Sequence, residues 1–444
     1  MFHVPSPSEQ SPRGARRRAA WLLPLLSVAI GLGAHAQTLP PLTLDQALAL
    51  AQERSLQIVA QDSAASGARE MAVAAGQLPD PTLRVSLDAL PINGSNRFSV
   101  TRDDFTMRTI GISQELTRDA KRKARSTRFE REAETAQASR AMVLANLQRD
   151  TAVAWLERYY QERIRDSLIA QRDESRLQVD AADAAYRGGR GSQADVFAAR
   201  ASVALIEDRI DQSDRQVANS VTQLARWVGA AAKQPLADKP ATDAVPLGAE
   251  DLEARFAHHP EIAVMASKQN VAQAEADLAR ANKKADWSVG LTYAKRGPSY
   301  SDYVFLSVSV PLQWDQVNRQ DRELAAKLAT VDQMRAERED ATREHVAQTL
   351  AMLQEWQNDR HRLERYDTTL IPLAGERTRA AIASYRGGAS GGAASSGLAA
   401  VLDARRAEID TRIDRLKLEL EAARLWAQLN YLIPAGHDAA VIRP

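Results

Sequence analysis

The strongest constraint on the fold of this chain is that its sequence repeats itself. Apolar and acidic positions ahead of a proline-containing stretch recur, in the same order, after it. The corresponding pairs are Leu56 and Ile262, Ile58 and Val264, Asp80 and Asp286, Leu83 and Val289, and Val85 and Leu291. The tetrapeptide Tyr-Arg-Gly-Gly also occurs twice, at 186–189 and 385–388. Repeats of this length indicate an internal duplication, which we place at residues 37–233 and 248–434, with a linker at 234–247.

Each repeat is predicted to contain a helix, two strands, a very long helix, a tight glycine turn and a returning helix. Residues 119–187 contain neither Gly nor Pro and consist mainly of good helix formers. A helix of that length reaches about 100 Å. The matching helix at 315–386 contains Pro372 and Gly375, so a kink is expected there. The turns and returning helices are predicted at 188–192, 193–229, 387–397 and 398–432.

The last returning helix carries two apolar seams. One seam has coiled-coil spacing and consists of Ile409, Ile413, Leu416, Leu420, Ala423 and Ala427. The other lies on a different face and consists of Leu418, Leu425 and Leu432. Two seams predict neighbours on two sides, as in a curved wall of helices. A solvated coiled-coil spacer is the alternative.

Four short segments alternate apolar and polar residues, at corresponding places in the two repeats. They are residues 82–90, 105–113, 287–295 and 303–312, the second being the least regular. This length and two-faced pattern suit a tilted strand that crosses a membrane. Aromatic residues, which favour the membrane boundary, gather nearby: Trp287, Tyr293, Tyr300, Tyr303, Phe305 and Trp314. The alternative is a small soluble sheet packed on helices.

Strands that cross a membrane also predict oligomerisation. Four strands cannot stay open at membrane depth, because the backbone groups at their edges would find no partners in hydrocarbon. The smallest spanning barrels have about eight strands. At least two chains must therefore contribute, and the sequence leaves the choice between two and three open.

The N-terminal 36 residues predict export. Four arginines between Arg13 and Arg18 precede an apolar stretch at 19–33, and Ala34-His35-Ala36 forms a cleavage site. A membrane anchor is the alternative, but about 15 apolar residues interrupted by Pro24 are fewer than a spanning helix needs. Residues 435–444 are expected to form a C-terminal tail.

Composition and motifs argue against several classes of protein. The 58 basic and 57 acidic residues nearly cancel, so no nucleic-acid partner is expected. The absence of Cys excludes disulfides, thiolate metal sites and lipid attachment. His258 and His259 precede Pro260, which suggests helix capping or surface exposure, and neither His345 nor His361 belongs to an HExxH motif. We therefore expect no enzyme, no cofactor and no dedicated metal site.

The ordered, duplicated pattern resembles the TolC family of outer-membrane efflux proteins, and in particular its CzcC/CusC-like branch. The resemblance covers essentially the whole mature chain and is carried by Leu44-Asp45-Gln46-Ala47-Leu48, Leu78-Pro79-Asp80-Pro81, the two Tyr-Arg-Gly-Gly turns and Val401-Leu402-Asp403-Ala404. It implies a mainly helical protein whose homotrimer combines a twelve-stranded outer-membrane β-barrel with a helical tunnel in the periplasm. It also implies a periplasmic adaptor protein and an inner-membrane pump of the resistance-nodulation-division class as partners.

The resemblance further assigns roles to residues. The adaptor-contacting tips are Tyr186, Arg187, Gly188, Gly189, Tyr385, Arg386, Gly387 and Gly388. Asp195 and Asp403 match acidic residues that narrow the closed entrance, although a helix-start or surface role is the alternative for each. Ala198 and Ala400 replace further acidic positions of the family, and small residues lengthen the second turn. The resemblance thus implies a duct whose cargo is heavy-metal cations. The alternatives are a multidrug or type I secretion duct of the same fold, or a periplasmic coiled-coil adaptor.

Overall fold

The computed structural model describes residues 40–245, 259–297, 299–386 and 394–433. The expected signal peptide and C-terminal tail lie outside these residues, as do the end of the linker and the first residues of the second repeat. Within the part of the chain that is described, no helix has the length of apolar sequence that a membrane crossing requires.

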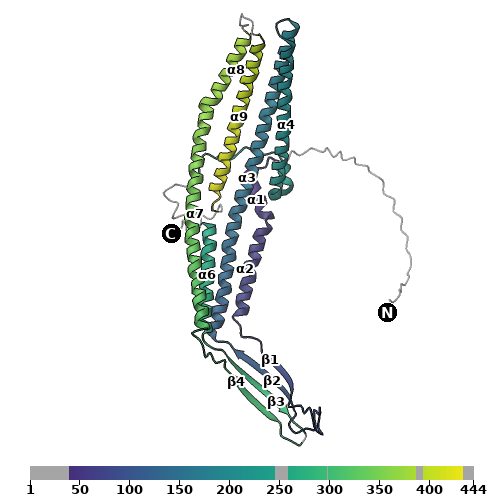
Figure 1. The fold of residues 1–444 in the computed structure, drawn as a ribbon, viewed down its shortest axis with the longest axis vertical. Helices are drawn as coiled ribbons and strands as arrows, with labels where there is room; N and C mark the ends of the chain where they lie inside the picture. Colours follow the sequence, from purple (N-terminus) through teal and green to yellow (C-terminus); the bar gives the residue numbers. More distant parts are fainter. Residues whose placement is uncertain (1–39, 246–258, 298, 387–393, 434–444) are drawn as a thin grey trace, which may run out of the picture. The chain divides into compact units, whose positions relative to one another are not determined.

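The first repeat begins with two short helices and continues, after two strands, with two long ones. They are α1 (Leu44–Arg54), α2 (Leu56–Ala75), α3 (Asp119–Arg187) and α4 (Gln193–Val228). A 3₁₀ turn, Gly229–Lys233, follows α4. Thr43 begins α1 with a capping box, and Ser55 ends α1 while its hydroxyl accepts the Ile58 N–H that begins α2. α3 has the range predicted for the long helix and pairs with the returning α4 (Figure 1).

The second repeat has the same order of elements. Its helices are α6 (Pro260–Asn282), α7 (Gln320–Arg365), α8 (Ile371–Arg386) and α9 (Ala394–Asn430). α6 packs against both α3 and α7, and α9 packs against α3, α7 and α8. Helices of the two repeats therefore pack directly against one another.

The helix predicted at 315–386 starts later and is interrupted. A π-helical segment, Tyr366–Leu370, separates α7 from α8, and the Ile371 N–H bonds to the Tyr366 carbonyl five residues earlier. Pro372 has no N–H to donate, and its ring crowds the carbonyl four residues before it. The wider π turn directly before Pro372 therefore accommodates the proline without ending the helix.

The four strands form one antiparallel sheet in the order β1-β2-β3-β4. They are β1 (Thr82–Asp88), β2 (Met107–Leu116), β3 (Trp287–Lys295) and β4 (Tyr303–Ser309). Three of these ranges differ from the predicted ones by a few residues. β1 ends early because Ala89 takes a positive φ of 55°, and β4 ends ahead of Pro311, which cannot donate to a ladder. The β2–β3 pair joins the two repeats.

The largest core cluster lies where α1, α3, α4, α7 and α9 meet. Trp155 on α3 is fully buried there, stacks on Tyr159 with ring centroids 5.6 Å apart, and donates its indole N–H to the Leu42 carbonyl at 3.1 Å. Leu42 also forms a parallel bridge with Leu236, which follows the 3₁₀ turn. The core thus fastens the start of the first repeat to the start of the linker.

A charge network fastens the linker to α9. Glu419 is mostly buried and is paired with both Lys239 and Arg415. Arg415 in turn reaches Asp367 of the π-helical segment at 2.7 Å. Burial acts to raise the pKa of Glu419, but the hydrogen bond to Lys239 and the charges of Lys239 and Arg415 outweigh it, so the pKa is lowered.

This network predicts acid sensitivity. Because folding lowers the pKa of Glu419, its contribution to stability is present above the unfolded value of about 4.3 and is lost as the pH falls through the folded value. We expect Glu419→Gln to cost about 1–3 kcal/mol at pH 7 and progressively less below pH ~4. Thermal melts of both proteins across that range measure this difference. The exposed Glu421 on the same helix is the control, and an equal loss in Glu421→Gln would contradict the prediction.

Candidate functional site

The first hairpin end lies between α3 and α4, at residues 188–192. Gly189 has φ +70°, a left-handed conformation that favours glycine, and the Gly188 N–H donates to the Ala184 carbonyl at 3.0 Å. Tyr186 is exposed, and the exposed Arg187 pairs with Asp183 at 2.5 Å. The glycines therefore make the turn, and the contact of the exposed Tyr186 and Arg187 with an adaptor stays a prediction.

Asp195 is part of the cap of α4. Its carboxylate accepts hydrogen bonds from the Ser192 N–H (2.9 Å) and hydroxyl (2.8 Å), and its own N–H donates to the Ser192 hydroxyl (3.2 Å). Only 7% of Asp195 is exposed in the single chain. Helix capping thus accounts for this residue locally, and its role at an entrance stays a prediction.

The second hairpin end lies between α8 and α9. Gly387 and Gly388 lie outside the described residues, whereas Arg386 is exposed at the end of α8. Tyr385 packs against Gly397 so closely that a Cβ atom on Gly397 would lie 3.2 Å from the tyrosine ring. Asp403 is exposed on α9, and its role at an entrance stays a prediction.

The structure brings the two hairpin ends together. A buried cluster joins one α3 residue, two α4 residues and one α9 residue: Ala182, Val196, Ala199 and Leu398. Tyr385 of α8 is partly buried against the same cluster. The sequence predicted each end separately, and the contact between them forms one surface that includes residues of both repeats.

The sheet exposes an apolar face. Its register aligns two rows of large apolar side chains across all four strands: Leu83, Ile112, Leu291 and Leu306, and then Val85, Ile110, Tyr293 and Val304. Every one of these side chains is exposed in the single chain, Leu306 by 75%. Apart from Phe305, which lies opposite Thr292, the other face carries mostly small and polar residues. They include the hydrogen-bonded pair Ser86 and Thr109, whose hydroxyls lie 2.6 Å apart. The predicted alternation is therefore present in the structure.

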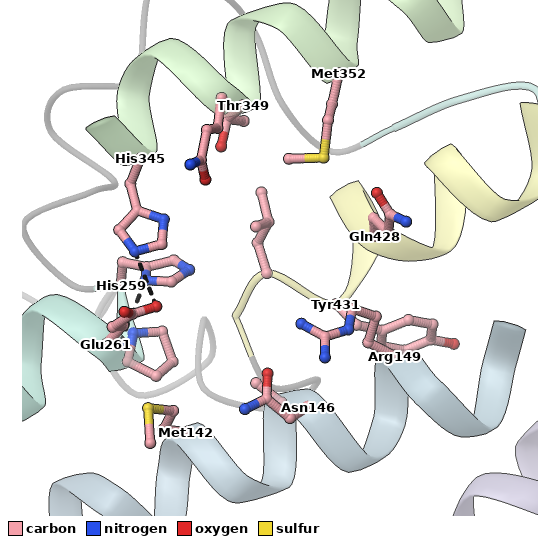
Figure 2. Close-up of a pocket in the computed structure, with 14 residues that line it drawn as sticks. Met142, Asn146, Arg149, His259, Glu261, His345, Thr349, Met352, Gln428 and Tyr431 are labelled. Carbon is pink, nitrogen blue, oxygen red and sulfur yellow. Dashed lines mark hydrogen bonds and ion pairs between the residues drawn. The ribbon is translucent and has the colours of Figure 1, made fainter. Parts of the chain in front are cut away.

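A pocket of about 230 Å³ lies between α3, α6, α7 and α9. Its wall includes Met142, Asn146, Arg149, Met352, Gln428 and Tyr431. At one end, the side chains of His259, Glu261 and His345 are directed toward one another (Figure 2). The sequence did not indicate that His259 and His345 meet, since nothing local in it relates the start of α6 to the middle of α7.

His259 caps α6 as the sequence suggested, because its Nδ1 accepts the Glu261 N–H at 3.3 Å. His258 lies outside the described residues. Burial lowers the pKa of His259 to about 4, and the nearby His345 acts in the same direction. The ring is therefore neutral at pH 7. His345 Nε2 contacts Glu261 Oε2 at 2.8 Å.

The fold is similar to that of solved channel proteins. The outer-membrane channel OprN matches with a TM-score of 0.74 at 16% identity, over 88% of this chain and 90% of that chain. The Campylobacter jejuni outer membrane channel CmeC matches with 0.70 at 10% identity, over 89% and 87%. CusC, described for its transmembrane channel formation, matches with 0.68 at 13% identity, over 87% and 91%. No family model and no curated protein matches the sequence. The chain thus has the fold of these channels.

Proposed function

We propose that this protein is an outer-membrane channel, the passive exit duct of a tripartite efflux system. The observation that carries the proposal is the exposed apolar face, whose two rows of side chains cross all four strands. Such a face is costly in water, and it matches the lipid-facing side of a membrane-spanning sheet. The solved channels that share the fold support the same function.

The duct requires several copies of the chain. Among the described strands, the outer edges of β1 and β4 have no partner, and unpaired backbone groups cost several kcal/mol each in lipid. β1 and β4 run antiparallel to one another because each successive pair in the sheet is antiparallel. β4 of one copy can therefore pair with β1 of the next in the usual way. Three copies close a ring of about twelve strands, the homotrimer that we propose.

Partners supply direction and energy. In this proposal the long helices line a periplasmic tunnel, and the joined hairpin ends contact an adaptor protein through Tyr186, Arg187, Tyr385 and Arg386. An inner-membrane pump of the resistance-nodulation-division class drives transport. We expect this passive part to need no enzymatic activity and no cofactor.

Membrane fractionation and conductance test the duct. We expect a heat-modifiable oligomer in the outer membrane and discrete conductance steps when the purified oligomer is added to a planar bilayer. A folded protein recovered only from the soluble periplasm would contradict the proposal and favour a coiled-coil adaptor.

The cargo is a separate step of the proposal. We infer heavy-metal cations from the resemblance to the CzcC/CusC-like branch. Loss of the protein should then lower tolerance of zinc, cobalt, cadmium or copper. Unchanged metal tolerance together with lost tolerance of organic toxins would instead favour a multidrug duct.

The entrance proposal assigns Asp403 and Asp195 to a ring of carboxylates. Asp403→Asn should weaken block by divalent cations several-fold, because one exposed carboxylate contact contributes about 0.2–1 kcal/mol and the ring contains one from each chain. Asp195→Asn should change block less, since that carboxylate is buried in the α4 cap. Conductance with added cation measures both variants. Identical block in wild type and Asp403→Asn would remove Asp403 from the entrance.

A further inference from the structure

Two histidines and a glutamate from different helices converge beside the pocket. His259 and Glu261 are at the start of α6, and His345 is on α7. One potential ligand atom from each of the three lies within 4.8 Å of the other two. The His259 and His345 rings are 5.0 Å apart between centroids, and His259 is buried, with 9% of its surface exposed.

We propose that His259, Glu261 and His345 bind a divalent transition-metal ion of the Zn²⁺ type, with one coordination position open toward the pocket. Two imidazole nitrogens and one carboxylate oxygen are a donor set that suits Zn²⁺, Co²⁺ and Ni²⁺. The ion would bind whether or not the assembled protein transports metal ions, so this inference stands apart from the proposed cargo.

The spacing of the three groups fits an ion after a small movement. At metal–ligand distances of about 2.1 Å, two tetrahedral ligands lie about 3.4 Å apart. The three potential ligand atoms lie within 4.8 Å of one another. To reach tetrahedral spacing, any two of them must approach by at most about 1.4 Å, a movement of the size that side-chain rotation allows. Glu261 and His345 are only partly buried, so both remain free to adjust, and the pocket has room for a water molecule as the fourth ligand.

The hydrogen bond of His259 defines what binding must change. A neutral ring has one proton, and because His259 Nδ1 accepts the Glu261 N–H, that proton sits on Nε2. An ion bound at Nε2 moves the proton to Nδ1, and an ion bound at Nδ1 takes the place of the N–H donor. Binding therefore exchanges the cap hydrogen bond and the His345–Glu261 contact for three metal bonds.

Such an ion would cross-link the start of α6 to α7. These helices pack together, and the cluster would fasten the beginning of the second repeat in a chain that has no Cys for disulfides. A ligand that binds only the folded state raises its stability. Bound Zn²⁺ is thus expected to raise the melting temperature of the helical part.

Metal titration of the intact protein, purified without a polyhistidine tag and treated with chelator, tests the proposal. We expect one Zn²⁺ per chain by calorimetry, and with Co²⁺ the intense visible absorption of a tetrahedral site. His345→Gln and Glu261→Gln should weaken binding by at least about tenfold. His259→Asn should do the same while keeping helix α6 capped, because Asn is a good N-cap residue.

His361→Gln is the matched control, since His361 is exposed on the same helix as His345. It should leave binding and the Zn²⁺-dependent rise in melting temperature unchanged. Melts in chelator show whether each variant is folded before metal is added. A wild type without stoichiometric binding, or equal binding in wild type and a folded His345→Gln variant, would overturn the site and leave the duct proposal untouched.

Discussion

Replacing Leu306 with arginine should prevent stable insertion of the protein in the membrane. Leu306 lies in the middle of β4, opposite Leu291, and is 75% exposed on the apolar face. If this face meets lipid, an arginine near the bilayer midplane costs about 2–4 kcal/mol in each chain. Because every copy in the ring carries the change, the proposed trimer incurs this insertion free energy three times. The expected result is a large loss of heat-modifiable oligomer from the outer-membrane fraction.

Ser307→Arg is the matched control for this experiment. Ser307 is the next residue of the same strand, and its hydroxyl lies on the opposite face, 3.4 Å from the Gly290 carbonyl. In the proposed barrel, the same charge at Ser307 would face the water-filled lumen. There it should alter ion selectivity and have little effect on membrane insertion. If the two variants insert equally well, or if Ser307→Arg alone fails, the apolar face does not meet lipid.

The sequence predicted the elements whose signals are local. The range of α3 follows from a run without Gly or Pro, and the sheet face follows from period-two alternation, so both were visible without tertiary information. Strand ends were less accurate, because they depend on single residues such as Ala89 with its positive φ. The π-helical segment before Pro372 shows the same limit, since a proline predicts a disturbance but not its form.

The site was predicted only in part, for a related reason. The Tyr-Arg-Gly-Gly repeats located both hairpin ends, but the packing of Tyr385 against the cluster that contains Val196 joins distant segments. Asp195 follows Ser192 by three residues, the spacing of a capping box, so its buried role had a readable signal. His259 and His345 had none, since their proximity arises only from the packing of α6 on α7.

Trp155→Ala should destabilise the helical part more than any single surface change. Trp155 is fully buried in the largest core cluster and stacks on Tyr159, and removal of a buried Trp side chain costs about 3–5 kcal/mol. Trp155→Phe should cost less, because a phenyl ring still fills part of the site and the Leu42 carbonyl keeps its bond from the Ala237 N–H at 3.1 Å. Loss of helical circular dichroism on heating measures both, with Glu130→Ala, an exposed position of α3, expected within about 0.5 kcal/mol of wild type. A Trp155→Ala protein as stable as Glu130→Ala would mean that this core does not hold α3 against the start of the first repeat.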